Sequence, residues 1–184
     1  MVSRIFPERI KTARLTMRQY VMEDSICLFE LVEKNRSQLI SNFGPTAKQL
    51  TSIESTRNFI ADCEQQWDQG TTFHFGLYVD AGQLIGQIKV KNIDLQNESL
   101  ELSYFIGQEY QRNGYAREGI WGIMRYAITD LQFRSIIVRI IAANKASLQL
   151  AQHLGFKLVE IREKEFTCGF GEVHDVHVFM LNSL

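Results

Sequence analysis

The chain has 184 residues, 45% of them hydrophobic, and a formal net charge of −1 at pH 7. This length is typical of one domain with a substantial core, so we expect a single domain over residues 1–184. The near-neutral charge argues against direct nucleic-acid binding, which usually needs a basic excess, and no apolar run is long enough to span a bilayer.

The apolar patterning predicts strands and helices that alternate along the whole chain. In order, we expect a strand over 15–20, a helix capped by Asp24, a helix over 51–69, strands over 73–79, 84–93 and 99–106, a helix over 116–132, a strand over 135–142, a helix over 146–154 capped by Asn144, and strands over 157–166 and 173–181. This order predicts an α/β fold whose mixed, mostly antiparallel sheet has helices on both faces. One parallel pair should form across the third helix.

The segment 111–116, Gln-Arg-Asn-Gly-Tyr-Ala, follows a predicted strand and opens a predicted helix. Unpaired backbone N–H groups at a helix start, with the helix dipole behind them, suit a phosphate or pyrophosphate. Gly114 would let the backbone approach such a ligand, and Ala116 keeps the first turn small. Many similar turns bind nothing, so that alternative stays open. Neither G-x-x-x-x-G-K-S/T nor G-x-G-x-x-G occurs, which excludes the two commonest phosphate loops.

Cysteine and histidine spacing gives no support for a structural metal. Cys27, Cys63 and Cys168 are widely separated and form no C-x-x-C pair, which fits a reducing cytoplasm. His174 and His177 are three residues apart in a predicted strand. Their side chains should therefore face opposite ways, and we expect no metal.

Two motifs together resemble the GCN5-related N-acetyltransferases (GNAT), in particular the RimJ/RimL branch that acetylates ribosomal proteins at their N-termini. Residues 111–116 fit the acetyl-CoA pyrophosphate loop Q/R-x-x-G-x-G/A of that family. Asn144 and Ser147 fit its N-x-x-S motif, and Leu154-Gly155-Phe156 fits the turn that follows. The resemblance covers about residues 14–181. It implies a GNAT-type fold in which the parallel strands splay apart into a V-shaped slot.

The resemblance also implies acetyl-CoA as cosubstrate and a set of residues that contact it. Ser147 is expected to donate a proton or hydrogen bond to the departing CoA thiolate. A thiol with a pKa near about 8.5 is a fair leaving group, so a weak donor suffices. The alternative is that Ser147 only satisfies the first turn of its helix. The expected acetyl-CoA contacts are Tyr104, Phe105, Ile106, Gln111, Arg112, Asn113, Gly114, Tyr115, Ala116, Asn144 and Ser147.

Glu101 is the candidate for accepting the proton of the amine. A carboxylate in the middle of a central strand is costly to bury without partners. Glu101 therefore either lies at the mouth of a cleft or pairs with a basic residue such as Arg139. In the resembling enzymes a second proposed base is a Glu in the strand after the N-x-x-S helix. An ungapped alignment places Thr167 there, with Glu163 and Glu165 nearby, so the identity of the base stays open.

We therefore expect a cytoplasmic, acetyl-CoA-dependent N-acetyltransferase in which the amine attacks the thioester directly within a ternary complex. The expected acceptor is the N-terminal amine of a protein, with a ribosomal protein as the precedent in the family, and we expect a homo-oligomer. Two alternatives remain open. One is an enzyme of the same fold that acetylates a polyamine, an antibiotic amine or an amino acid. The other is a noncatalytic sensor that binds acyl-CoA.

Overall fold

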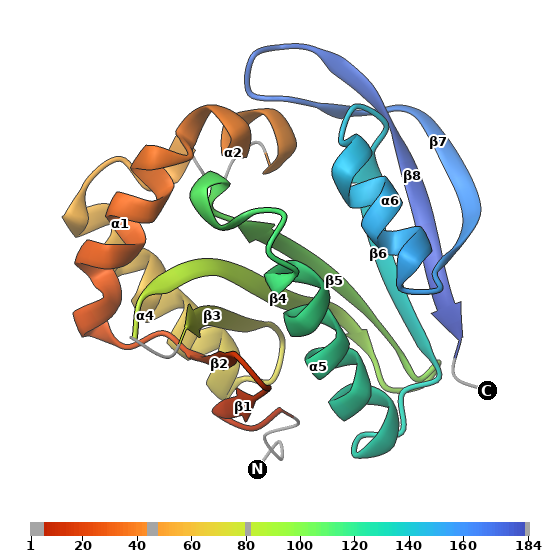
Figure 1. The fold of residues 1–184 in the computed structure, drawn as a ribbon, viewed down its shortest axis with the longest axis horizontal. Coiled ribbons are helices and arrows are strands. Elements are labelled where there is room, and N and C mark those ends of the chain that lie inside the picture. Colours follow the sequence, from red (N-terminus) through yellow and green to blue (C-terminus); the bar gives the residue numbers. More distant parts are fainter. Residues whose placement is uncertain (1–5, 44–47, 80–81, 183–184) are drawn as a thin grey trace.

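The computed structural model describes residues 6–43, 48–79 and 82–182. Within these residues eight strands form one mixed sheet in the order β1-β2-β3-β4-β5-β6-β8-β7, in which only β5 and β6 are parallel (Figure 1). The predicted α/β fold is thereby confirmed. The short β1 was not predicted. The strands are β1 Arg9–Lys11, β2 Leu15–Gln19, β3 Phe73–Val79, β4 Leu84–Asp94, β5 Ser99–Ile106, β6 Ser135–Ile141, β7 Lys157–Thr167 and β8 Val173–Asn182.

Helices cover both faces of the sheet, as predicted (Figure 1). On one face α5 and α6 enclose a core that includes Phe75, Ile88 and Ile123. On the other face α1, α2 and α4 pack against Tyr20 and Tyr78. Burying one large apolar side chain stabilises a fold by roughly 1.5–3 kcal/mol, so these two cores hold the sheet rigid between them. The helices are α1 Ser25–Lys34, α2 Arg36–Phe43, α4 Ile53–Asp68, α5 Tyr115–Thr129 and α6 Lys145–His153.

The start of α1 differs from the prediction. Asp24 precedes the helix, but its side chain makes no capping bond to α1. Its carboxylate instead accepts hydrogen bonds from the Val21 N–H at 2.8 Å and from the Arg18 guanidinium at 2.7 and 2.8 Å. Burial would raise the pKa of Asp24, but these donors outweigh it and lower the pKa. The carboxylate thus ties β2 to the turn before α1.

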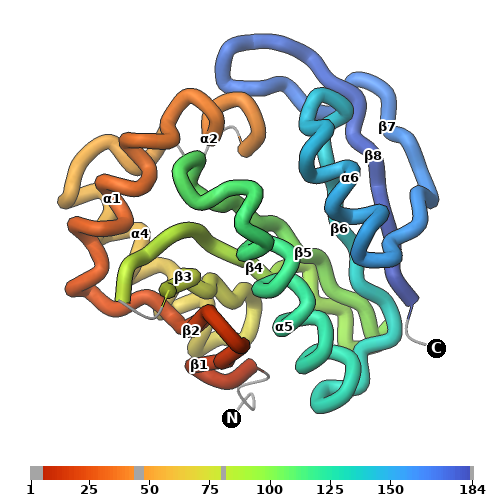
Figure 2. The backbone as a smooth tube through the Cα atoms, viewed as in Figure 1, coloured from red at the N-terminus to blue at the C-terminus, as the bar shows by residue number. Residues whose placement is uncertain are grey.

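The two parallel strands separate halfway along their length. Their last paired residues are Leu102 of β5 and Val138 of β6. Beyond this pair β5 continues to Ile106 and β6 to Ile141, and the two strands diverge toward these ends (Figure 2). The backbone of the second half of β5 therefore has no β6 partner, which confirms the expected splay.

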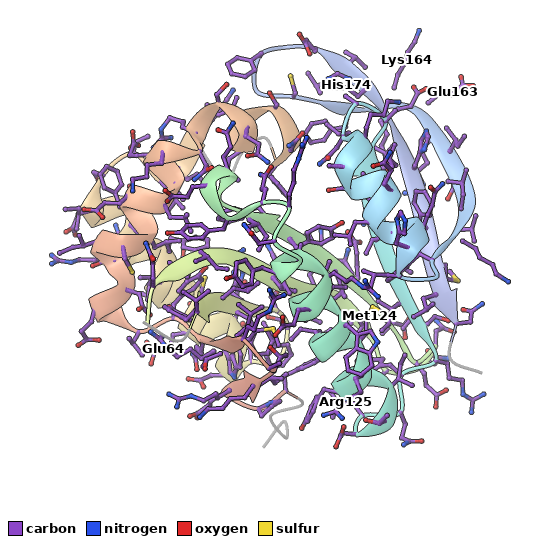
Figure 3. All side chains as sticks on the ribbon, in the orientation of Figure 1. Glu64, Met124, Arg125, Glu163, Lys164 and His174 are labelled. Atoms are coloured by element: carbon purple, nitrogen blue, oxygen red, sulfur yellow. The ribbon has the colours of Figure 1, made fainter. Side chains whose placement is uncertain are left out.

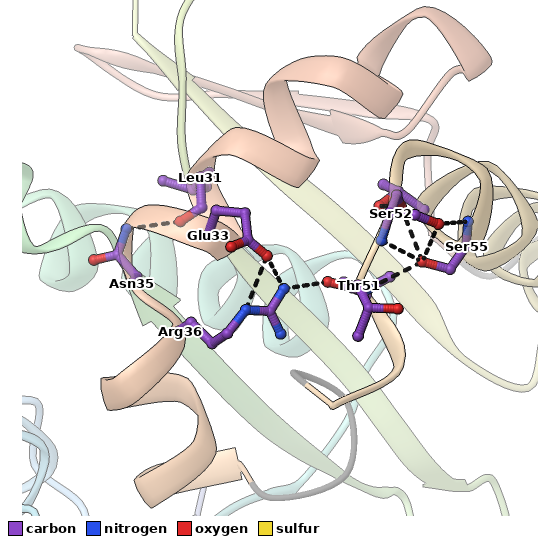
Figure 4. A network of polar contacts seen from close by, with 9 residues as sticks. Leu31, Glu33, Asn35, Arg36, Thr51, Ser52 and Ser55 are labelled. Atoms are coloured by element: carbon purple, nitrogen blue, oxygen red, sulfur yellow. Dashed lines mark hydrogen bonds and ion pairs between the residues drawn. The ribbon is translucent and has the colours of Figure 1, made fainter.

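A polar network fixes the start of the helix α2, which the sequence did not predict, to the end of α1 and the segment before α4 (Figure 4). Asn35, at the corner between α1 and α2, donates to the Leu31 carbonyl at 2.8 Å and accepts from the Gln108 N–H at 2.8 Å. Arg36 binds the Glu33 carboxylate and the Leu50 carbonyl. These bonds hold α2 next to the segment that leaves β5. None of the described helices is long and apolar enough to cross a membrane.

Candidate active site

Two cavities adjoin at the splay between β5 and β6. The first, the loop cavity, has a volume of about 440 Å³ and is bordered by Gln111, Arg112 and residues 114–117. The second, the sheet cavity, has a volume of about 400 Å³ and lies over β3, β4 and β5. A ligand in one cavity can therefore reach a ligand in the other. Both cavities are lined by Asn42, Phe43, Tyr104, Phe105, Asn144 and Ser147.

The loop that borders the first cavity presents backbone to the ligand side. Gly114 is the residue before α5 and has a φ of 81°, a conformation that side chains other than glycine adopt at a cost. No side chain caps α5 at Gly114, so the first N–H groups of the helix are open to an anion. The Gln111 side chain donates to the Ile106 carbonyl at 3.0 Å and holds the loop against the end of β5.

An ion pair that the sequence did not reveal supports this loop from behind. The Arg14 Nε atom lies 2.7 Å from a Glu118 carboxylate oxygen, and another guanidinium nitrogen donates to the Asn113 carbonyl at 3.0 Å. The guanidinium also lies 4.7 Å from the ring centroid of Tyr115. Burial would raise the pKa of Glu118, but hydrogen bonds from Thr12 and Arg14 outweigh it and lower the pKa. The anionic Glu118 in the first turn of α5 also suits the helix dipole.

All the predicted acetyl-CoA contacts except Asn113 line the loop cavity. The Asn113 side chain instead turns back onto the loop and donates to the carbonyls of Tyr110 and Gln111, at 3.3 and 3.1 Å. Arg117, which the sequence did not single out, also lines the cavity beside Arg112. These two cations and the open helix start make the cavity suited to phosphate groups.

Two hydroxyl groups lie at the junction of the cavities. Asn144 accepts a hydrogen bond from the Ser147 N–H at 3.1 Å, which confirms the predicted cap of α6. The cap uses the backbone of Ser147 and leaves its hydroxyl to face the cavities. The Tyr104 hydroxyl is buried, and no described residue lies at hydrogen-bonding geometry to it. Burial raises the pKa of Tyr104, and the nearby Ser147 acts in the opposite direction.

Glu101 lies in the sheet cavity and is only 4% exposed. One carboxylate oxygen accepts from Arg139 at 2.6 and 3.0 Å and from Asn92 at 2.8 Å, and the other lies 3.0 Å from the Lys91 ammonium. Burial would raise the pKa of Glu101, but the hydrogen bonds from Arg139 and the charge of Lys91 lower it. The predicted pairing with Arg139 is thus present, and it weakens Glu101 as a proton acceptor.

A bulge in β7 brings a second carboxylate to the sheet cavity. The β7–β8 register shifts between Arg162 and Phe166, and the Lys164 N–H donates to the Asp175 carboxylate at 2.8 Å. Glu165 lines the cavity, and one of its oxygens lies 3.1 Å from Arg162. Thr167 is not among the lining residues, and Glu163 is exposed on the β7–β8 hairpin, where Figure 3 labels it beside Lys164.

His174 lies on the same hairpin (Figure 3), and its Nε2 atom is 3.4 Å from a Glu172 oxygen. Together with Cys168, these residues place three potential ligand atoms within 4.8 Å of one another. His177 instead packs near the ring of Phe179, at a centroid distance of 6.4 Å. The two histidines therefore do not face a common ion.

A splayed parallel strand pair, a helix start suited to an anion and a second cavity at the opening are the features expected of an acyl-CoA-dependent transferase. The chain belongs to the GNAT acetyltransferase family, because residues 14–157 match the family model described as acetyltransferase (GNAT) domain. It is an N-acetyltransferase that uses acetyl-CoA as its cosubstrate.

Known proteins similar to this chain include relatives in sequence and in structure. The N-acetyltransferase p20 of Bacillus licheniformis is 24% identical over 175 residues, which cover 95% of this chain and 96% of the relative. RimL, a ribosomal L7/L12 α-N-protein acetyltransferase solved with coenzyme A, aligns with a TM-score of 0.88 at 19% identity, over 95% of this chain and 97% of RimL. RimJ of Mycobacterium smegmatis aligns with a TM-score of 0.89 at 16% identity, over 97% and 89% of the two chains. At these identities the solved structures establish the fold alone.

Proposed function

We propose that this enzyme transfers the acetyl group of acetyl-CoA to the N-terminal amine of a protein, with a ribosomal protein as the first acceptor to test. The meeting of the two cavities at Ser147 and Tyr104 carries the proposal, because it lets an amine approach a thioester from the opposite side. RimL, a ribosomal L7/L12 α-N-protein acetyltransferase that shares the fold, provides the precedent for a ribosomal protein as acceptor.

In the proposed reaction the neutral amine attacks the thioester carbonyl at the junction of the cavities. Holding both reactants at one place removes much of the entropic barrier. A backbone N–H in the unpaired half of β5 polarises the carbonyl oxygen and stabilises the tetrahedral intermediate. The C–S bond then breaks, and the CoA thiolate takes up a proton with Ser147 as the donor, while the amine loses a proton. Tyr104, Phe105 and Ile106 line this part of the donor site.

Glu101 is the proposed acceptor of the amine proton, acting through water. An α-amine has a reference pKa of about 7.7–8.0, so a weak base suffices. Its ion pairs with Lys91 and Arg139 favour the carboxylate form at neutral pH. Glu165 is the second candidate, because it also lines the sheet cavity and is 3.9 Å from Arg139.

A panel of acceptors tests the proposal. CoA thiol release would be followed with short peptides that carry a free N-terminus, with the same peptides blocked at the N-terminus, and with polyamines, aminoglycosides and amino acids. We expect turnover only with free N-termini, and mass spectrometry should place the acetyl group on the α-amine. Turnover confined to small amines would show that the acceptor is a small amine and not a protein N-terminus. Acetyl-CoA binding without any turnover would support the noncatalytic sensor.

The proposal includes a cytoplasmic homo-oligomer. Cys27, Cys63 and Cys168 are all free thiols, which suits a reducing compartment. The edge strand β7 exposes apolar side chains, including 53% of Val159 and 50% of Ile161, and such an edge favours self-association. Sedimentation equilibrium would measure the oligomeric state, and a monomer at micromolar concentration would contradict this part of the proposal.

A further inference from the structure

The floor of the sheet cavity is one face of three adjacent strands. His74 of β3 stands opposite Lys89 of β4, and Lys89 stands opposite Ser103 of β5, so the three side chains leave the sheet on the same side. The facing wall is apolar and comes from α1, α2, α4 and the segment before α4. Charges on the floor therefore act over a low-dielectric space. The wall residues are Leu28, Val32, Leu39, Leu50 and Phe59.

Three cationic side chains line this cavity, and two of them have a carboxylate partner. Lys91 and Arg139 both bind Glu101, at 3.0 and 2.6 Å. Lys89 is half-buried and forms no ion pair or hydrogen bond with any residue in the described ranges. Burial, and then repulsion from Lys91, lower the pKa of Lys89. An unpaired buried ammonium is unfavourable, and an anion placed beside it would relieve that cost.

The neighbouring His74 does not supply that anion, and it leaves a second polar atom unpaired. Its side chain is 3% exposed, and its Nε2 atom lies 3.2 Å from the Gln66 side-chain oxygen. This contact assigns the proton to Nε2, so Nδ1 is an acceptor. Within the described residues Nδ1 is buried and has no partner at hydrogen-bonding geometry, although the Gln87 side chain is close enough to act on the ring. Burial, together with the charge of Lys89, lowers the pKa of His74 to about 3, so the ring is neutral at physiological pH. The floor thus lacks an anion beside Lys89.

We propose that Lys89 binds a carboxylate of the acceptor, so that the acceptor is an acidic amine. On the proposed function, on which this inference rests, that acceptor is a protein N-terminus with Asp or Glu at its first or second position. Lys89 stands opposite Ser103, two residues before Phe105 at the junction of the cavities. Two residues of strand span about 7 Å, which is comparable to the distance from an N-terminal amine to such a carboxylate. A backbone N–H of the same peptide can donate to His74.

Matched peptides test the proposal through specificity. Each pair would differ only in Asp against Asn, or Glu against Gln, at position 1 or 2, and free aspartate against asparagine would test a small acidic amine. The wild-type enzyme should favour the acidic member at least tenfold in kcat/KM, through a lower KM. The preference should decline as salt is raised, because salt screens the interaction. Lys89→Met should remove the preference, and Lys89→Arg should retain part of it.

The control is Lys157→Met, which removes an exposed charge from β7 outside both cavities and should keep the preference. Lys89→Met should also melt no lower than the wild type, because it removes an unpaired buried charge. If that variant nevertheless fails to fold, Lys89→Gln takes its place. Equal kcat/KM values for acidic and amide peptides in the wild type would overturn the inference. So would a preference that survives in the Lys89→Met variant.

Two outcomes separate this inference from the proposed function. The enzyme could acetylate free aspartate but no peptide, with that activity lost in Lys89→Met. This result would support the role of Lys89 and exclude a protein N-terminus as the acceptor. Equal acetylation of peptides with acidic and with neutral side chains at positions 1 and 2 would support the proposed function and contradict the role of Lys89. Calorimetry of the acidic peptide with the CoA-bound enzyme provides a readout that does not depend on turnover. The wild type should bind the acidic peptide at least tenfold more tightly than Lys89→Met does, and equal affinities would overturn the inference.

Discussion

The two halves of the site are built in different ways. The loop cavity combines one nearly continuous run, Gln111, Arg112 and residues 114–117, which includes a helix start, with residues of α2, β5 and α6. The sheet cavity is formed by single side chains from strands and helices far apart in the sequence, such as Lys89, Glu101 and Glu165. A backbone site is suited to the phosphates that every acyl-CoA carries. A side-chain site can change its acceptor without a change of fold, which is why the fold alone does not identify the acceptor.

The same contrast appears in their charges. The loop cavity combines a helix dipole with Arg112 and Arg117, and no acidic residue is among its described lining residues. The sheet cavity holds a paired cluster around Glu101 and one unpaired cation, Lys89. Substitutions in the first half should therefore change affinity for acetyl-CoA, and substitutions in the second half should change stability or acceptor choice.

The largest effect is expected at the junction, where both halves meet. Ser147→Ala should lower kcat by about 100-fold, the low end for a general acid because CoA is a good leaving group. Affinity for acetyl-CoA should be nearly unchanged, and so should the melting temperature, because the cap of α6 uses the Ser147 backbone N–H. Steady-state kinetics would measure kcat, and thermal melting would measure the melting temperature. As a control, Asn144→Ala should lose the cap and destabilise the protein by roughly 1 kcal/mol. Near-wild-type turnover in Ser147→Ala would leave Ser147 with no role in proton transfer.

The next effect belongs to the sheet cavity. Glu101→Gln should destabilise the fold by about 1.5–3 kcal/mol, because it removes charged hydrogen bonds to a buried carboxylate. The folded-state pKa of Glu101 is lowered, so this contribution should be complete above about pH 4.3 and lost as the pH falls through the folded-state pKa. Urea titrations across this range would measure it.

A pH–rate profile of the same variant addresses catalysis. If Glu101 accepts the amine proton, the rate of Glu101→Gln should rise more steeply with pH than that of the wild type, because only neutral amine then reacts. A large loss of stability with an unchanged pH profile would assign Glu101 a structural role and transfer the role of base to Glu165 or to water.

A smaller effect should be confined to the loop cavity. Gly114→Val should weaken acetyl-CoA binding at least tenfold, roughly 1.4 kcal/mol, because a side chain at a φ of 81° displaces backbone next to the phosphates. Calorimetry would measure the affinity. Gly82→Val is a matched control, since Gly82 has a φ of 77° and open space around it but lies outside both cavities. Unchanged affinity in a folded Gly114→Val variant would contradict the loop assignment.

The smallest effect is expected for Tyr104→Phe. We expect kcat to fall by less than tenfold, because the Tyr104 hydroxyl supports Ser147 without being the main donor. Stability should stay the same or rise, since the substitution removes a buried hydroxyl without a partner. Steady-state kinetics would measure the change in kcat, and differential scanning calorimetry would measure the change in stability. A loss of stability of more than about 1 kcal/mol would show that the hydroxyl has a structural partner in solution.

Local features of the site could be predicted, and distant ones could not. The strand–loop–helix around Gly114 and the cap by Asn144 depend on neighbours in the sequence, so composition and spacing reveal them. The support of the loop by Arg14 could not be predicted, because Arg14 and Glu118 are 104 residues apart. Asp24 shows the same limit: it has the right residue type for a cap of α1, but a strand neighbour, Arg18, binds its carboxylate.

By itself the sequence determined the order of the elements except β1 and α2, and it indicated the family and a candidate phosphate-binding loop, because each depends on short-range periodicity or contiguous motifs. Only the tertiary structure decided which side chains line the sheet cavity, the proposed acceptor site. The strand register places Lys89 between His74 and Ser103, and the bulge in β7 places Glu165, instead of Thr167, in the sheet cavity. A shift of one residue in register moves every side chain to the other face of a sheet. Long-range pairing sets that register, so the acceptor site becomes visible only in the folded chain.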